Sequence, residues 1–197
     1  MTTRLPALQR FIDRMRALCA ATPNGAARWQ QAKPLLAALL ADPELKARSA
    51  AWPKGKEPGA NYPVNLLFYE DPDYGFAVNA LIKDPNETTS VHDHAHTWTL
   101  YGVLEGGERV VRYTRKDDGA DPTRAELAPL DDHTVTPGFI DVVPPREIHA
   151  EFNGPQRTIA VILRSAKVGG FMQSHFAPDT GKVTQAPGPR QVPYDLT

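Results

Sequence analysis

The sequence predicts a mainly β chain that begins with a short helical segment. Three observations lead to this expectation. The first fifty residues carry apolar side chains at helical spacing, and after them come short β-type runs between turn signals. The 19 prolines and 14 glycines favour many short elements joined by turns.

The N-terminal fifty residues predict two helices and a short third turn. An amphipathic stripe with three- and four-residue steps comprises Leu5, Leu8, Phe11, Ile12, Met15 and Leu18. The run 22–25, Thr-Pro-Asn-Gly, ends this first helix. A second helix is expected over 26–41, where Pro34 should kink it or mark a new start. Asp42-Pro43-Glu44 opens the third element.

Most of the rest of the chain is predicted to form short strands. The expected runs are Val64–Tyr69, Gly75–Ile82, Thr97–Leu104, Arg109–Tyr113, Ile140–Val143, Ile148–Phe152 and Thr158–Arg164. Short strands at this spacing predict a sandwich or a jelly-roll barrel. The tail after Gly181 is expected to wrap the surface or to be partly disordered. We expect one compact domain, with residues 1–50 packed as helices on a barrel formed by residues 51–197.

Composition excludes several classes of partner. The net charge is −1 with both signs interspersed, so we expect no nucleic-acid partner. No apolar run approaches the ~18 residues of a membrane span, and Met1–Arg4 lacks the apolar core of a secretory signal. The single Cys19 fits a reducing compartment. The expectation is a cytoplasmic monomer or homodimer that acts on a small molecule.

Histidines at two-residue spacing are the strongest chemical signal. His92 and His94 would face the same side of a strand, because side chains alternate along an extended chain. Two imidazoles on one short segment bind a divalent metal well. A third from a neighbouring strand completes a set with open positions, which is typical of a catalytic rather than a structural site.

Two segments resemble the paired motifs of the cupin superfamily. The first motif reads G-x5-H-x-H-x3,4-E-x6-G, and His92 and His94 fill its histidines. The second reads G-x5-P-x-G-x2-H-x3-N, and it matches at Gly138, Pro144, His149 and Asn153. The departures are Asn86 and Arg146 at glycine positions and Thr99 at the glutamate. The resemblance implies a cupin jelly-roll barrel with His149 as the third metal ligand.

The absence of the motif's glutamate indicates which group within the superfamily the chain resembles. Three neutral imidazoles leave the metal its full double charge, which favours an anionic substrate such as a thiolate or carboxylate. The set is similar to that of the cysteine dioxygenase-like family of thiol dioxygenases over residues 60–165. This resemblance implies Fe(II), O₂ and oxidation of a small thiol to a sulfinate. Zn, Ni or Mn are alternative metals.

The chain also departs from that family. The Ser-His-Tyr relay of thiol dioxygenases would fall at Ile162, Arg164 and Ala166, so it is absent. The substrate-binding arginine of an early strand would fall at Val64. Arg164 is a candidate replacement that could clamp a carboxylate bidentately, and the alternative is a surface or rim salt bridge.

The directions of other side chains are predicted from the alternation of residues along a strand. Thr99 should face the metal without ligating it strongly, and Tyr101 should line the cavity as a hydrogen-bond donor or pack in the core. His96 is a weaker candidate contact, because the strand should bend after His94. Asp93 should point outward to solvent or a loop. His133 and His175 are expected at the surface.

Three functions remain open at this stage. The first is an Fe(II) dioxygenase of a small carboxylate-bearing thiol. The second is a non-redox metal-dependent cupin enzyme, such as an isomerase, a lyase or a hydrolase, in which a three-His Zn²⁺ site acidifies water. The third is a cupin that senses a small acid without turnover. The fold alone does not decide among them.

Overall fold

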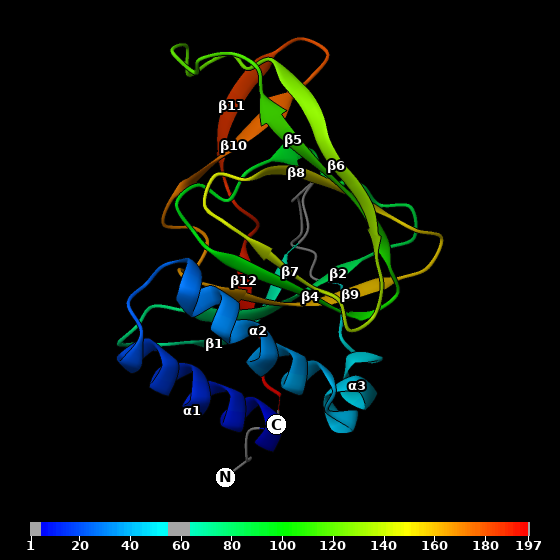
Figure 1. Cartoon of the computed structure of the whole chain (residues 1–197). Coiled ribbons are helices and arrows are strands. Elements are labelled where there is room, and N and C mark those ends of the chain that lie inside the picture. Colours follow the sequence, from blue (N-terminus) through cyan, green and yellow to red (C-terminus); the bar gives the residue numbers. More distant parts are fainter. Residues whose placement is uncertain (1–4, 55–63, 197) are drawn as a thin grey trace.

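Two six-stranded sheets face each other in a computed structural model of the chain, which describes residues 5–54 and 64–196 (Figure 1). In order across the first sheet run β12 (Gln191–Pro193), β1 (Asn65–Glu70), β2 (Ala77–Lys83), β9 (Thr158–Arg164), β4 (Thr99–Glu105) and β7 (Ile140–Val143). The second sheet runs β11 (Lys182–Pro187), β10 (Met172–Ala177), β3 (Val91–His92), β8 (Ile148–Asn153), β5 (Glu108–Arg115) and β6 (Leu127–Val135). All neighbouring pairs are antiparallel except β12 with β1.

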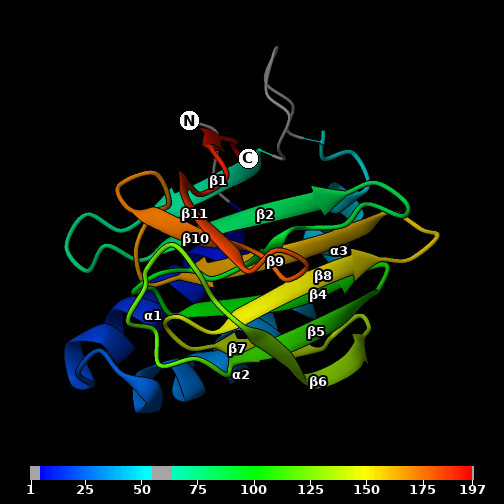
Figure 2. The same cartoon turned by 90° about the horizontal axis from the view of Figure 1, so that it is seen from above.

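This architecture confirms the predicted fold class, a mainly β jelly-roll barrel of two facing sheets with N-terminal helices. The helices are α1 (Pro6–Ala21), α2 (Ala26–Leu40) and α3 (Pro43–Ser49). Seen from above, the second sheet lies over the first sheet, and the helices lie on the far side of the first sheet (Figure 2). None of the helices in the described ranges has the length and apolar content that crossing a membrane requires.

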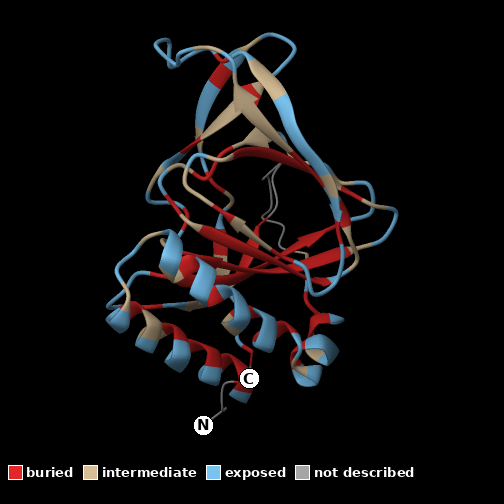
Figure 3. Cartoon of the chain, viewed as in Figure 1, coloured by how far each residue is buried: buried red, intermediate tan, exposed pale blue. Residues whose placement is uncertain are grey.

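The helices cover the outer face of the first sheet. Their buried sides turn toward the strands and their exposed sides toward solvent (Figure 3). Gly102 of β4 permits a close approach of α2, because a Cβ atom there would lie 2.7 Å from the Leu40 Cδ1 atom. Pro34 neither ends α2 nor starts a new helix, since the helix continues through it to Leu40. Asp42 caps α3 by accepting hydrogen bonds from the backbone N–H groups of Glu44 and Leu45.

Strand β9 is buried on both faces, and its alternation separates two cores. Ile159, Val161 and Leu163 pack in the core shared with the helices. Ala160 and Ile162 belong to the smaller core inside the barrel. Residues of even number on β9 therefore face the barrel interior, which includes Arg164 at the end of the strand.

The C-terminal region contradicts one sequence expectation. The tail after Gly181 was expected to wrap the surface or to be partly disordered, but it forms β11 in one sheet and β12 in the other. Leu196 is buried, and its carbonyl accepts a hydrogen bond of 3.0 Å from the Leu5 N–H. Strands β3, β6 and β10 were also missed, because their sequences are short or polar and lack the alternating apolar pattern.

Candidate metal centre

Three histidines meet inside the barrel. His92 lies on β3, His94 follows just after this strand, and His149 lies on β8 directly opposite His92. One nitrogen from each ring lies within 4.8 Å of the other two. His94 and His149 are buried and His92 is partly buried. Among the described residues, this is the only group of three or more possible metal donors gathered so closely.

A turn after β3 aims His94 at the cluster. Ala95 has a φ angle of +51°, and the Thr97 N–H donates to the His94 carbonyl, so the chain bends as expected. Of the two alternatives expected for Asp93, the structure contradicts the solvated one, because the residue is buried, and agrees with a carboxylate that faces its own turn. Its Oδ1 atom accepts from the N–H groups of Ala95 (2.9 Å) and Ser174 (3.0 Å), which fixes the turn against β10.

Backbone carbonyls orient two of the imidazole rings. The His92 Nδ1 atom lies 2.9 Å from the Ser90 carbonyl oxygen, and the His149 Nδ1 atom lies 3.1 Å from that of Glu147. When Nδ1–H donates to a carbonyl, the lone pair available for a metal is on Nε2. Both rings are thus held in the tautomer that binds a metal.

Burial keeps two of the three histidines neutral. Burial, with a smaller effect from His92, lowers the pKa of His149 to about 4. Burial and then the nearby Arg164 guanidinium lower the pKa of His94 well below its ordinary value. At neutral pH these two rings therefore have free lone pairs, which is the form that binds a metal ion. The donor set fits a divalent cation.

His92 and His94 open onto a cavity of about 360 Å³ lined by residues of both sheets. Leu81 of β2 and Ile162 of β9 supply apolar wall, and His92 on β3 of the other sheet and His94 just after this strand also line the cavity. A volume of this size accommodates a small organic molecule beside the histidines.

Arg164 is a buried cation in this cavity. Its side chain is only 4% exposed, and among the described residues no carboxylate lies within ion-pair distance of it. Its Nη1 atom is 3.5 Å from the Thr99 Oγ1 atom, and its Nε atom has no hydrogen-bond partner. Burial lowers its pKa to about 10, so the guanidinium stays charged at neutral pH. Of the two alternatives for Arg164, the structure excludes the surface salt bridge.

Thr99 and Tyr101 face the interior from β4. Thr99 stands opposite Arg164 and Tyr101 opposite Ile162 in the β4–β9 register. Tyr101 lines the cavity, and its buried hydroxyl lies near the Glu108 carboxylate. Burial, and next the Glu108 carboxylate, raise the pKa of Tyr101 well above its ordinary value, so the phenol keeps its proton.

Sequence reasoning missed a buried charged cluster beside the histidines. The Lys83 Nζ atom lies 2.5 Å from Glu108 and 3.9 Å from Glu151, and it is 5.4 Å from the centre of the Tyr101 ring. Burial alone would raise the pKa of Glu151, but the charge of Lys83 holds it below its ordinary value. One feature of the sequence could have revealed this cluster. Lys83 comes two residues after Leu81 at the end of a buried strand, so both side chains point to the same face of the sheet.

The remaining histidines divide between cavity and surface. His175 was expected at the surface, but it lines the cavity, and its ring stacks on His92 with centroids 6.0 Å apart. Its Nδ1 atom is 2.8 Å from the Ser90 hydroxyl. His96 is exposed, with its ring against Phe171, and His133 on β6 lies near Phe139. The expected arginine position of the early strand is occupied by buried Val64, and residues 61–63 lie outside the described residues.

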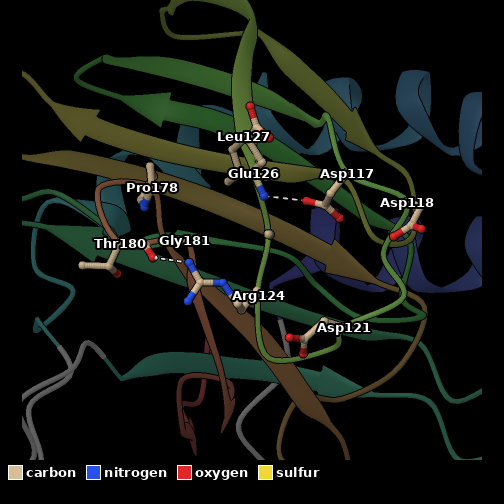
Figure 4. A pocket seen from close by; sticks show the side chains of 10 residues that line it. Asp117, Asp118, Asp121, Arg124, Glu126, Leu127, Pro178, Thr180 and Gly181 are labelled. Carbon is tan, nitrogen blue, oxygen red and sulfur yellow. Dashed lines mark hydrogen bonds between the residues drawn. The ribbon is translucent and has the colours of Figure 1, made fainter.

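A second hollow of about 430 Å³ lies away from the histidines and is rich in acidic groups (Figure 4). Asp117 accepts from its own loop and from Arg115, and Asp121 accepts from Thr123. These carboxylates stabilise the loops that carry them. The hollow therefore offers no additional metal site comparable to the three histidines.

Comparison with known proteins gives distant similarities. No protein-family model matches the chain. Similar solved structures include the cupin domain of Schizosaccharomyces pombe Cnp3, at 10% identity over 60% of this chain and 72% of that one, with a TM-score of 0.44. KdgF from Halomonas sp. aligns at 14% identity over 52% of this chain and 77% of that one, with a TM-score of 0.40.

A recombinant oxalate oxidase in complex with glycolate aligns at 22% identity, with a TM-score of 0.37. The alignment covers 47% of this chain and 42% of the oxalate oxidase, so the chain spans less than half the length of that protein. Identities and TM-scores this low carry no information on the chemistry of the cavity described here.

Proposed function

We propose that this chain is an Fe(II)-dependent, cysteine dioxygenase-like cupin enzyme that oxidises a small carboxylate-bearing thiol to a sulfinate. In this proposal His92, His94 and His149 hold the metal, and Arg164, Tyr101 and Thr99 act on the substrate. The observation that carries it is a buried, charged Arg164 with no carboxylate within ion-pair distance among the described residues, in a cavity that is also lined by His92 and His94 of the three-histidine group.

Arg164 gives the cavity its preference for an acid. A guanidinium that has lost its water and lacks a carboxylate partner binds an incoming carboxylate strongly, with two parallel hydrogen bonds. Thr99 accepts from this guanidinium and so helps to fix the plane of the fork. The substrate would therefore bind with its carboxylate on Arg164 and its sulfur toward the histidines.

The other residues prepare the cavity for oxidation. Leu81 and Ile162 exclude water from the reacting groups, and Tyr101 offers a protonated phenol that can donate a hydrogen bond to bound oxygen or substrate. When bound, Fe(II) would supply adjacent positions for the thiolate and O₂ and transfer electrons between them. Both atoms of O₂ end on sulfur, so the conversion of RSH and O₂ to RSO₂H needs no external reductant.

An oxygen-electrode screen tests this proposal. The protein is loaded anaerobically with Fe(II) and mixed with air-saturated 3-mercaptopropionate, mercaptosuccinate, cysteine or cysteamine. We expect one O₂ consumed per thiol, sulfinate product by mass spectrometry, and both atoms of ¹⁸O₂ incorporated. Cysteamine is the matched control, because it has no carboxylate for Arg164 and should react poorly. No oxygen uptake with any thiol would refute the dioxygenase.

The buried Lys83–Glu108–Glu151 cluster favours a second candidate, a non-redox metal-dependent enzyme. Acid–base catalysis needs titratable groups in a dry cavity, and thiol oxidation does not use all three. Native purification distinguishes the two candidates. Bound Zn²⁺ without oxygen consumption would favour a hydrolase, lyase or isomerase, whereas bound iron with oxygen consumption would favour the dioxygenase.

A further inference from the structure

Four buried amide side chains have polar atoms without a hydrogen-bond partner among the described residues. They are Asn65 on β1, Asn79 on β2, Gln173 on β10 and Gln191 on β12. Buried polar groups are almost always paired, and each unpaired one costs about 1–3 kcal/mol. Asn65 and Gln173 line the same cavity as Arg164, so a ligand bound there can contact both amides.

The Asn65 side chain offers the cavity both a donor and an acceptor. Its neighbour Leu66 packs in the core shared with the helices, so Asn65, which is 0% exposed, faces the interior side of β1. The Asn65 N–H donates to the Arg190 carbonyl at 2.8 Å, which fixes the backbone. Neither Oδ1 nor Nδ2 has a hydrogen-bond partner in the described part of the chain. A carboxamide or a hydroxyl, which also donates and accepts, complements such a side chain.

Gln173 adds a donor from the opposite sheet. It is two residues before His175 on β10, so both side chains face the cavity. Gly188 makes room for the Gln173 amide, because a Cβ atom at this glycine would lie 2.6 Å from the Oε1 atom. The Nε2 atom has no hydrogen-bond partner within residues 5–54 and 64–196. Contact with Gly188 therefore limits the positions of the amide, and its Nε2 atom remains available to a ligand.

The strand register separates Asn65 from Arg164 along the cavity. Arg164 pairs with Ala77 of β2. Three positions further along β2, Ala80 pairs with Leu66, which follows Asn65 in the chain. Asn65 therefore lies four positions along β2 from the level of Arg164, or roughly 13 Å at about 3.3 Å per residue. The reach of the two side chains shortens this gap, but a ligand whose carboxylate is on Arg164 still needs a chain of several bonds to reach Asn65.

We propose that Asn65 and Gln173 bind an uncharged carboxamide or hydroxyl group at the end of the substrate remote from its carboxylate. This inference rests on the proposed function, because it takes Arg164 as the carboxylate site. It names the substrate class as a thiol acid that carries an amide or hydroxyl group several bonds from its carboxylate. Such an acid supplies a partner for Asn65 as well as for Arg164, whereas 3-mercaptopropionate supplies one for Arg164 alone.

Calorimetric titration of the full chain as purified tests the amide site without any thiol chemistry. The probes are adipamate and 6-methylheptanoate, which share a carboxylate and a chain length but end in a carboxamide and in its apolar isostere. Comparing them cancels whatever the carboxylate contributes. We expect the wild type to bind adipamate at least about tenfold more tightly, because the carboxamide pairs with buried amide groups. Asn65→Leu should remove this preference, and Gln173→Met should reduce it.

Asn79→Leu is the matched control. Asn79 is also a buried amide without a hydrogen-bond partner among the residues that the structure describes, but it does not line the cavity. This variant should keep the preference for adipamate. Equal affinity of the wild type for the two probes would overturn the inference, and so would a preference that persists in Asn65→Leu or disappears in Asn79→Leu.

This experiment and the oxygen-electrode screen can fail independently. A preference for adipamate that depends on Asn65, without oxygen uptake from any thiol, would support the amide site and refute the dioxygenase. Oxygen uptake together with equal affinity for the two probes would refute the amide site alone. Arg164→Met should weaken the binding of both probes to the same degree, because each presents a carboxylate. If it weakened neither, Asn65 would not contact the remote end of an acid held by Arg164, and the inference would be overturned.

Discussion

Arg164 is a buried charge that the folded chain alone does not satisfy. Its guanidinium is 4% exposed, its hydrogen-bond contact is Thr99 at 3.5 Å, and the Glu151 carboxylate acts on it only from beyond ion-pair distance. Removing such a group from water costs several kcal/mol unless an opposite charge compensates it. The residue is therefore costly for folding and favourable for binding an anion, a conflict that is typical of functional sites.

Replacing Arg164 should separate stability from binding. We expect Arg164→Met to keep or raise the melting temperature, because the apolar side chain fills similar space without a desolvated charge. The same change should raise KM for a carboxylate-bearing thiol about 100-fold, equivalent to roughly 3 kcal/mol of lost charge-assisted hydrogen bonding. Thermal unfolding and oxygen-uptake kinetics measure the two effects. Arg109→Met is the matched control, because Arg109 is exposed and paired with Asp132.

The sequence predicted some site residues and missed others for a physical reason. His92 and His149 were identifiable from their places on strands, whereas His94 lies beyond β3 and is aimed at the cluster by the turn that follows, not by strand alternation. His175 and Glu151 depend on which strands become neighbours. His175 reaches the cavity only because β10 pairs with β3, and this long-range register leaves no trace in a short sequence window.

At the scale of elements, strand prediction succeeded where alternation or continuous burial was strong. The run Thr158–Arg164 matches β9, and Ile140–Val143 matches β7. Strand β6 was missed because its side chains are largely exposed and polar, so no apolar period marks it. The two-residue β3 is too short for any periodic signal, and it is held by β8 on one side and β10 on the other.

Pro34 places a helix-breaking residue on the exposed side of α2. Proline removes one backbone hydrogen bond and costs about 3 kcal/mol in a helix interior, while its restriction of the unfolded chain returns about 0.4–1 kcal/mol. We therefore expect Pro34→Ala to stabilise the fold by roughly 2–2.6 kcal/mol, measured by denaturant unfolding. Lys33→Ala, at the exposed neighbour, should change stability little. An unchanged or lower stability of Pro34→Ala would contradict this account.

A buried carboxylate attaches α1 to the turn between β1 and β2. The Asp71 Oδ2 atom accepts from Arg16 at 2.6 Å and from the Tyr69 hydroxyl at 2.9 Å. Its Oδ1 atom accepts from the N–H groups of Asp73 and Tyr74. Burial alone would raise the pKa of Asp71, but the hydrogen bonds from Tyr74 and Arg16 outweigh it and hold the pKa below its ordinary value.

This depressed pKa predicts a pH-dependent contribution to stability. The ionised form of Asp71 stabilises the fold fully above the unfolded pKa of about 3.9, and the contribution disappears as pH falls through the lower folded value. Asp71→Asn should therefore destabilise the protein by about 1–3 kcal/mol at pH 7 and by progressively less below pH 4. Asp73→Asn should have a smaller effect, because this second partner of Arg16 is 64% exposed. A pH-independent difference between wild type and Asp71→Asn would refute the role of the charge.

At the scale of the whole molecule, the two sheets contribute different parts of the cavity. The histidines and Glu151 come from the second sheet, and Arg164, Tyr101 and Lys83 come from the first. The helices cover the outer face of the first sheet, so only the inner face of this sheet can contact a ligand. Any cation at the histidines would therefore tie β3, the turn after it and β8 together inside the barrel.

Metal binding should accordingly stabilise the whole fold. His94 and His149 are 55 positions apart in the sequence, so the unfolded chain does not present them together. An ion that binds only the folded state adds about 2.7 kcal/mol when its concentration is 100 times Kd. For a chain of this length the increase corresponds to about 5–10 °C in melting temperature. Differential scanning calorimetry with and without Fe(II) or Zn²⁺ measures it.

The quantity to compare between variants is the rise in melting temperature when metal is added. The absolute melting temperature is not suitable, because replacing the buried His149 also changes packing. His149→Ala should lose the increment, and His133→Ala should keep it, because His133 lies on the outer strand β6. Chelation should return the loaded wild type to the melting temperature of the metal-free protein. An equal increment in His149→Ala would mean that the ion binds elsewhere on the surface, and the barrel would then have no metal-dependent stability.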